Sequence, residues 1–253
     1  MNNNDVSTRA RTYLAIIIAL LLIGTAFGVQ ITTNPPESPP FDLLPTMLRG
    51  LSVTIGLAFF GSILALVIAV ITGILRSSPY RIVRVLASVY VEVFRGTSIL
   101  VQLFWIFFVL PLPPFNLEIP AFTAGVIALG LNVGAYGAEV VRGAIQSISR
   151  GQIDAAIALN MSRGLMMRRV ILPQALVRIV PPFGNLLIEL LKATSLVALI
   201  TLADITFQAN TLRQALGVRR IQEIYLVLLA IYFLIAYPIT LGVRWVESQR
   251  QWA

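Results

Sequence analysis

The chain has 253 residues, of which 57% are hydrophobic and only 12% are charged, about half the charged fraction of an average soluble domain. A soluble domain of this length has too little interior to bury that much apolar side chain, so the composition indicates a membrane protein. The sequence contains no Cys and no His, which excludes disulfides, thiolate chemistry and the commonest general base and metal ligand. We therefore predict no catalytic residue and no metal site.

Six apolar segments approach the length of about 20 residues that a helix needs to cross the hydrocarbon. Because Pro, Gly or charged residues bound each of them, we predict an all-α membrane protein with about six transmembrane helices. The first segment could also be a signal peptide, but no small-x-small cleavage pattern follows it, so we expect a retained helix. Pro181 and Pro182 suit the first turn of the fifth segment. The six segments are roughly 13–29, 51–75, 86–110, 121–141, 180–203 and 224–243.

Arginines between the apolar segments predict the orientation, because cytoplasmic loops carry an excess of Arg and Lys. With the N-terminus inside, 13 basic residues fall on the cytoplasmic side and four outside. We therefore expect a multi-pass membrane protein with both termini in the cytoplasm. Thr211 to Arg220 is a basic segment on the outer side, which we interpret as a short surface helix.

The connection between the fourth and fifth segments, from about Arg142 to Arg178, is much longer than the others. It is too polar to span a membrane. Ile153, Ile157 and Met161 recur in it at i, i+4 and i+8, a spacing typical of an amphipathic helix. We expect short helices lying at the cytoplasmic face.

This connection resembles the EAA loop of ABC importer permeases. The family pattern is Glu-Ala-Ala, three residues, Gly, and then about nine residues to Ile-x-Leu-Pro. Here Asp154-Ala155-Ala156 stands for the first part, Asn160 replaces the Gly, and Val170-Ile171-Leu172-Pro173 completes the pattern. The Gly position needs a left-handed backbone, and Asn is the non-Gly residue best suited to that conformation, so we expect the turn to survive.

Three further stretches are similar to the polar amino-acid subfamily of these permeases, and the resemblance covers about residues 45–245. They are 93–102 (VFRGTSILVQ), 135–145 (AYGAEVVRGAI) and 191–196 (LKATSL). The aromatic pairs Phe104-Trp105 and Phe107-Phe108 also resemble permeases for ectoine-type compatible solutes. The resemblance implies two domains of unequal size: 1–44, with the tail, the first helix and a Pro-rich linker, and 45–253, the permease domain with a coupling loop at about 147–178.

The resemblance also implies a location in the bacterial inner membrane, partners and a mechanism. Two permease subunits, identical or paralogous, would form a pathway, two ATPase subunits would dock on the loops, and an extracytoplasmic binding protein would deliver the solute. The only lysine, Lys192, follows Leu191, so the chain has no Gly-Lys-Ser/Thr phosphate loop, and we expect ATP and Mg²⁺ to be bound by the partner ATPase and no cofactor by this chain. The residues that the pattern assigns to ATPase coupling are Asp154, Ala155, Ala156, Asn160, Met161 and Arg163.

Polar residues inside the apolar segments are the candidates for a solute pathway, since a charge at mid-bilayer needs a reason. Two triplets each share one helical face: Asn132, Tyr136 and Glu139, and Asn185, Glu189 and Lys192. The alternative is internal neutralisation by the i, i+3 pairs Glu92–Arg95, Glu139–Arg142 and Glu189–Lys192. The full candidate set is Gln102, Asn132, Tyr136, Glu139, Asn185, Glu189, Lys192 and Ser195.

Other functions remain open at this point. A self-sufficient secondary transporter would need a broken helix or an unpaired acid at the midplane, for which Glu139 or Glu189 could serve. A membrane enzyme would have to rely on carboxylates, Ser or Lys, and the sequence shows no nucleophile elbow, metal cluster or phosphate loop. The sequence favours a permease subunit for polar amino acids or related small zwitterions, with ectoine-type solutes as the alternative substrate.

Overall fold

The computed structural model describes residues 40–248, and every regular element in this part of the chain is helical. Four helical segments are long and apolar enough to cross a membrane, and a bent pair makes a fifth if it is counted as one span. The predicted helix at 13–29 and most of the Pro-rich linker lie outside the described residues. The four segments are Leu51–Arg76, Ala121–Gln146, Arg163–Ile200 and Val218–Trp245.

The described chain divides into two compact units, one of residues 57–193 and one that combines residues up to 56 with those from 194 onward. The first unit contains most of α3 (Leu51–Arg76) and the elements that follow it up to Ala193. These are α4 (Arg81–Gly96), α5 (Ile99–Phe104), the π-helical turn η2 (Trp105–Val109), α6 (Ala121–Gln146), α7 (Arg150–Ala158), α8 (Arg163–Met166), the π-helical turn η3 (Met167–Ile171) and α9 (Leu172–Ala193).

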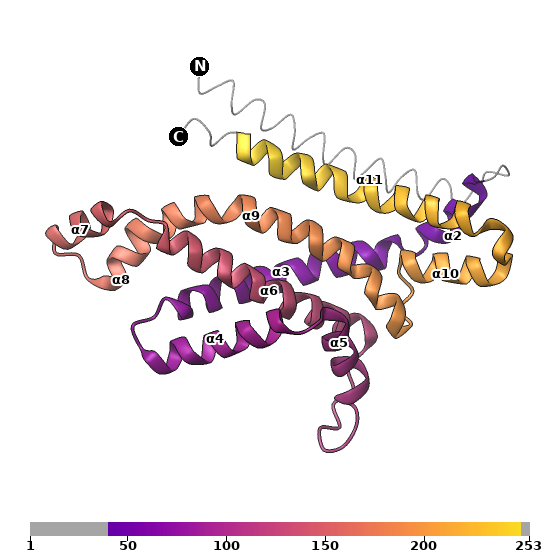
Figure 1. Cartoon of the computed structure of the whole chain (residues 1–253), viewed down its shortest axis with the longest axis horizontal. Coiled ribbons are helices and arrows are strands. Elements are labelled where there is room, and N and C mark those ends of the chain that lie inside the picture. The colour runs from indigo at the N-terminus through magenta and orange to yellow at the C-terminus, as the bar shows by residue number, and fades with distance from the viewer. Residues whose placement is uncertain (1–39, 249–253) are drawn as a thin grey trace. The chain divides into compact units, whose positions relative to one another are not determined.

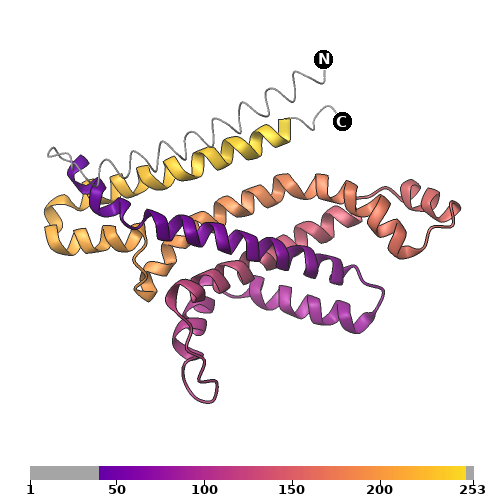
Figure 2. The ribbon, with the colours of Figure 1, turned by 180° about the vertical axis from the view of Figure 1, so that it is seen from behind.

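Helix α6 is the centre of this unit, with α4, α5 and α9 packed against it (Figures 1 and 2). Small residues let its neighbours approach closely. A Cβ atom added at Gly137 would lie 2.7 Å from the Cβ of Ala69 in α3 and 2.8 Å from the Phe183 ring in α9. Gly130 and Gly134 face α3 in the same way, through Leu64 and Ile68. Gly130, Gly134 and Gly137 therefore serve helix packing.

The third predicted span, 86–110, is wrong as a single helix. Helix α4 begins earlier, at Arg81, and the chain bends by 104° between α4 and the α5–η2 segment. Thr97 and Ser98 carry the bend with extended backbone angles, ψ 155° and 135°. The stretch Gly96-Thr97-Ser98 lies inside an apolar run, but its small and hydroxyl residues are those that favour a break.

The start of the fifth span also differs from the prediction. Helix α9 begins at Leu172, so Pro181 and Pro182 lie inside it and not in its first turn. The π-helical turn η3 ends at Ile171, two residues before Pro173, which has no N–H to donate to the carbonyl of Arg169 four residues back. A wider turn accommodates this missing bond. Beyond Ala193 the chain continues as the 3-10 helix η4 (Thr194–Ile200).

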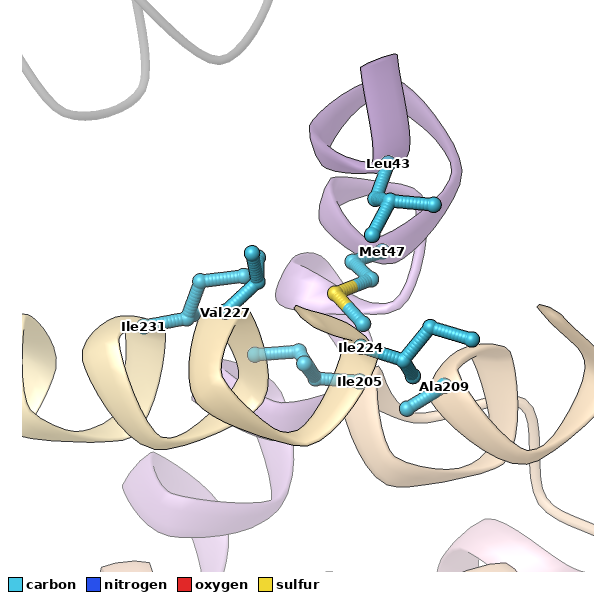
Figure 3. Packing of buried hydrophobic residues seen from close by; sticks show 7 residues of the cluster. All are labelled: Leu43, Met47, Ile205, Ala209, Ile224, Val227 and Ile231. Carbon is cyan, nitrogen blue, oxygen red and sulfur yellow. The ribbon is translucent and has the colours of Figure 1, made fainter. Parts of the chain in front are cut away.

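The other unit contains η1 (Phe41–Leu43), α2 (Leu44–Leu48), η4, α10 (Ile205–Leu216), η5 (Val218–Arg220) and α11 (Ile221–Ser248). Its core is a buried apolar cluster at the junction of α2, α10 and α11, and Figure 3 shows Met47 of α2 pointing toward Ile224 of α11. Helix α10 includes residues 211–216 of the surface helix predicted at 211–220, but it begins earlier, at Ile205. Its first turns belong to the core, since Ile205 and Ala209 are buried. The cluster consists of Leu43, Met47, Ile205, Ala209, Ile224, Val227 and Ile231.

Polar contacts also stabilise this unit. The guanidinium of Arg220 donates to both carboxylate oxygens of Asp42, at 2.6 and 2.8 Å, and holds the pKa of the Asp42 carboxyl below its usual value. Asp204 caps α10 by accepting the Phe207 N–H at 2.7 Å, and burial raises the pKa of this carboxyl. Gly50 lies so close to Asp204 that an added Cβ would be 2.3 Å from its backbone carbonyl carbon.

Candidate functional site

The predicted coupling loop is a helix, a turn and a second short helix, α7 and α8, which lie together at one end of α6 and α9 (Figure 1). Asn160 follows the end of α7 with φ 54°, which is the left-handed conformation that the sequence predicts at this position. The N–H of Met161 donates to the carbonyl of Ala156, at 3.1 Å, and the N–H of Asn160 donates to that of Ile157, at 2.8 Å. This pair of bonds is the Schellman arrangement, so Asn160 supports the turn that Gly makes in the family pattern.

The loop presents most of its side chains to solvent. Asp154, Ala155 and Arg163 are exposed, Met161 is half-buried, and Ala156 is buried with 3% of its surface accessible. The predicted stripe of Ile153, Ile157 and Met161 is therefore not the buried face. Ile157 is 59% exposed, because α7 ends at Ala158 and the chain turns before Met161 can continue the same face.

Side chains fasten the loop to the two long helices. The guanidinium of Arg178 in α9 donates to the hydroxyl of Ser147, at 2.6 Å, and to its backbone carbonyl. Gln174 in α9 donates to the side chain of Gln152 in α7, at 3.4 Å. Ser147 follows the last residue of α6, so these contacts join the loop, α6 and α9 into one connected segment.

Glu139, a candidate for the solute pathway, binds two arginines. The Nε of Arg142 donates to one carboxylate oxygen at 2.9 Å, which confirms the i, i+3 pair expected from the sequence. Arg76, the last residue of α3, forms an ion pair with the other oxygen. Arg76 was not among the predicted site residues, because the sequence alone does not show which residue of α3 faces Glu139, 63 positions later in the chain.

The candidate Tyr136 is 39% exposed, and the guanidinium carbon of Arg95 lies 5.2 Å from the centroid of its ring. The tyrosine hydroxyl also donates to the carbonyl of Arg95, at 3.5 Å. Glu92 and Arg95, both in the described part of the chain, do not form the expected ion pair, because the arginine packs on the aromatic ring. Such a cation–π contact holds the charge next to α6.

Three candidates on α9 share one exposed face. Asn185, Glu189 and Lys192 are exposed in the isolated chain, although they lie in an apolar helix of membrane-spanning length. Exposed charges on such a helix need a polar neighbour or water when the protein is in lipid. Ser195 lies in η4, in the other compact unit, and is half-buried.

Gln102 and Asn132 lie together, and both are buried, with 9% and 7% of their surface accessible. The amide nitrogen of Asn132 donates to the side-chain oxygen of Gln102, at 3.1 Å. Both amides also donate to the carbonyl of Phe94, near the end of α4. The structure therefore brings these two candidates together but gives them protein partners.

Known proteins resemble this chain over most of its length. Residues 65–251 match the family described as binding-protein-dependent transport system inner membrane component. The probable amino-acid ABC transporter permease protein y4tF of Sinorhizobium fredii is 44% identical over 82% of this chain and 88% of its own length. The L-cystine transport system permease protein TcyB of Bacillus subtilis and the glutamine transport system permease protein GlnP of Escherichia coli are each 37% identical, over 83% and 81% of this chain and 91% and 93% of their own lengths.

Solved structures show the same fold. A chain of an amino acid ABC transporter, crystallised with histidines, superposes with a TM-score of 0.74 at 36% identity, over 81% of this chain and 94% of that chain. A chain of the MetNI methionine ABC transporter in an inward-facing conformation gives a TM-score of 0.65 at 20% identity, over 83% of this chain and 99% of that chain, and so supports the fold. The family match and these relatives together show that the chain belongs to the inner membrane components of binding-protein-dependent transport systems.

Proposed function

We propose that the chain is the permease subunit of an ATP-driven importer of amino acids or related small zwitterions. It would pair with a second permease, identical or paralogous, bind two ATPase subunits on its cytoplasmic side and receive solute from an extracytoplasmic binding protein. ATP and Mg²⁺ would be bound by the ATPase subunits. The names of the relatives, which include glutamine and L-cystine permeases, support the substrate class.

The observation that carries the docking part of the proposal is the exposed loop around Asp154. Apolar and charged side chains lie next to each other there, with Ile157 59% and Leu159 77% exposed beside exposed Asp154 and Arg163. A monomer in water gains nothing from displaying large aliphatic side chains on a rigid turn, whereas a protein partner can bury them. The short helix α7 would lie in a groove of the ATPase, with the charges at the rim.

Two features support movement of the loop together with the spanning helices. Arg178 and Ser147 join α9 to the end of α6, and Gln174 joins α9 to α7. A displacement of α7 by the ATPase would therefore act on two long helices at once. This is the property that a subunit needs if it converts ATPase closure into rocking of membrane helices.

The solute pathway would run past the exposed polar residues of the spanning helices. Asn185, Glu189 and Lys192 on α9 offer an amide, a carboxylate and an ammonium group, which together match the two charges of a zwitterion. Tyr136 and Arg95 offer a second polar surface on α6 and α4. Glu139 is neutralised by two arginines, which makes it a poor proton-coupling acid and disfavours a self-sufficient secondary transporter.

The test is charge reversal in the loop with a matched control. Asp154→Lys should abolish co-purification with the ATPase in mild detergent and ATP-driven uptake in liposomes, because it places a cation where the docking surface presents a carboxylate. Glu118→Lys makes the same charge change on another exposed connection, which the predicted topology places outside, and should leave ATPase association unchanged. If Asp154→Lys still binds the ATPase and supports uptake, the docking assignment is wrong.

A second measurement tests the topology. Because the chain has no cysteine, a single Cys at residue 154 or 118 can be labelled without a background reaction. A membrane-impermeant maleimide added to intact cells should label residue 118 once it has access to the periplasm, and residue 154 only after the inner membrane is opened. Labelling of residue 154 from outside would contradict cytoplasmic docking.

A further inference from the structure

The bend between α4 and α5 leaves backbone carbonyls at the end of α4 without the N–H partners that a continuous helix would supply. The last carbonyl groups of a helix have no partner within the helix, and the break at Thr97 and Ser98 removes the residues that would otherwise donate to them. A carbonyl that is packed among helices or faces the hydrocarbon meets no water, so it needs a donor from the protein. The donors here come from side chains.

Gln102, in the first turns of α5, supplies the first set of donors. Its amide nitrogen lies 2.9 Å from the carbonyl oxygen of Phe94, 3.3 Å from that of Thr97 and 2.7 Å from the Thr97 hydroxyl. The Thr97 hydroxyl in turn donates to the carbonyl of Val93, at 2.7 Å. One side chain after the break therefore binds back to the end of the helix before it.

Asn132 supplies the second set from a different helix. Its amide nitrogen donates to the carbonyl of Phe94, at 3.0 Å, and to the side-chain oxygen of Gln102, at 3.1 Å. The carbonyl of Phe94 can only accept, so the NH₂ group of each amide must face it, and this fixes the orientation of both amides. The result is a closed set of hydrogen bonds that joins α4, α5 and the middle of α6.

We propose that Gln102 and Asn132 form a clamp that sets the angle of the α4–α5 bend and locks it to α6. They are positioning residues, and their buried amide groups act on the backbone and not on the solute. Asn132 lies 15 residues before Ser147, which is about 22 Å along the helix axis, so α6 connects this clamp to the coupling loop. The inference rests on the proposed function in one respect: a movement of the loop would carry the bend with it.

Carboxylate substitutions test the clamp because they keep shape and remove donors. At a pH high enough to ionise the introduced carboxyl, Gln102→Glu and Asn132→Asp place a charged oxygen where the NH₂ group was, and it repels the carbonyl oxygens that it faces. The distances are therefore measured at alkaline pH first. Gln146→Glu is the matched control in α6, since Gln146 uses its side-chain oxygen as an acceptor for Arg142, at 2.6 Å, and a carboxylate preserves that role. Thr97→Val removes one hydroxyl from the clamp and is a milder variant if either carboxylate variant cannot be purified.

The angle itself can be measured. Spin labels on cysteines at Val85 of α4 and Phe108 of η2, both about half-exposed, report the distance between the two arms of the bend. The unaltered chain and Gln146→Glu should give the same narrow distance distribution. Gln102→Glu and Asn132→Asp should broaden or shift it, and Thr97→Val should do so to a smaller degree.

Acidification gives a readout that general destabilisation would not produce. A protonated Glu side chain regains one O–H donor, so the distribution of Gln102→Glu should narrow again as the pH is lowered, whereas that of Thr97→Val should not respond.

Transport is the second readout. The rate of solute uptake into liposomes that contain the ATPase and are supplied with the binding protein should fall about ten-fold or more in Asn132→Asp. Association with the ATPase should persist, which separates this result from a failure of the proposed docking function.

Two results would overturn the inference. Unchanged distance distributions in both carboxylate variants would show that the amides do not set the bend. A changed distribution with normal uptake would show that the bend angle is not needed for transport, so the two residues would not be positioning residues.

Discussion

Two of the interruptions of helical structure in the unit of residues 57–193, the bend after α4 and the turn after α7, are held in different ways. At the bend after α4, side chains bind three backbone carbonyls, those of Val93, Phe94 and Thr97. The amides of Gln102 and Asn132, which supply most of these bonds, are buried, whereas Thr97 is exposed. At the turn after α7, the backbone closes on itself through Asn160 and Met161, and the surrounding side chains are exposed.

The difference follows from how far water can reach the unpaired backbone groups at each interruption. A turn in water can leave unpaired carbonyls to the solvent, so a left-handed residue and two backbone bonds are enough. At the bend, the amides of Gln102 and Asn132 are buried, and they donate to the carbonyl of Phe94 where water does not reach them. We expect the first kind to be sensitive to backbone conformation and the second to side-chain chemistry, and α6 connects the two.

The largest effect on the free energy of unfolding is expected in α6, the helix that connects the two interruptions. Gly137→Ala would place its Cβ 2.7 Å from the Cβ of Ala69 and 2.8 Å from the Phe183 ring, and overpacking of this kind costs about 1–3 kcal/mol. Gly143→Ala in the same helix meets nothing within 4 Å and should raise the free energy of unfolding by about 0.5–1 kcal/mol, because Ala favours a helix. Reversible unfolding in mixed micelles measures both, and equal effects would show that α6 does not pack as closely as the structure has it.

The second largest effect is expected for a substitution at the turn after α7. Asn160→Val keeps a side chain of similar size but forces a β-branched residue into φ 54°, which costs about 1–2 kcal/mol. Hydrogen exchange of the Met161 amide, which donates to Ala156, should quicken by roughly 5–30-fold. Asn160→Gly should leave the exchange rate within a factor of about two, because Gly adopts this conformation readily. Comparable exchange in all three chains would mean that the left-handed residue does not hold the turn.

These two interruptions also differ in how far sequence reasoning could reach. The turn at Asn160 was predictable, because the pattern around Asp154 and Pro173 places it and the conformational preference of Asn explains the substitution. The same reasoning identified the spans at α3, α6 and α11 to within a few residues, except that α11 begins at Ile221 and α6 extends to Gln146. It missed the exposure of Ile157, since spacing alone does not say where a short helix ends.

The bend at Thr97 was not predicted, because hydropathy over 86–110 gives no sign of it. The local signal, Gly96-Thr97-Ser98, was present but weak within an apolar run. The function of Gln102 and Asn132 was out of reach for a stronger reason: Asn132 binds the carbonyl of Phe94, 38 residues earlier in the chain. From sequence alone a polar residue in a span indicates a solute contact and a backbone clamp equally well, and only the three-dimensional positions decide which acceptors it faces.

A smaller effect is expected where side chains fasten the loop to α6 and α9. Arg178→Met removes the donors to Ser147 and should lower the free energy of unfolding by about 1 kcal/mol, the usual net value of such a hydrogen bond. Arg169→Met removes the same charge from an exposed residue of η3 and should change it by less than about 0.5 kcal/mol. The ratio of ATP hydrolysed to solute transported should rise only in Arg178→Met, because the loop would then move partly without α6. An unchanged ratio would show that the contact between Arg178 and Ser147 does not transmit the movement.

The smallest effect is expected for the contact between Gln174 and Gln152, and it tests the comparison most directly. The two side chains are 3.4 Å apart at an exposed position, where water competes for both partners. A double-mutant cycle of Gln152→Ala and Gln174→Ala should give a coupling energy below about 0.5 kcal/mol. A coupling above about 1 kcal/mol, the value of a well-formed hydrogen bond, would mean that side chains also hold the water-exposed interruption. The contrast with the buried amides of Gln102 and Asn132 would then lie in burial alone, and not in whether side chains or the backbone hold the interruption.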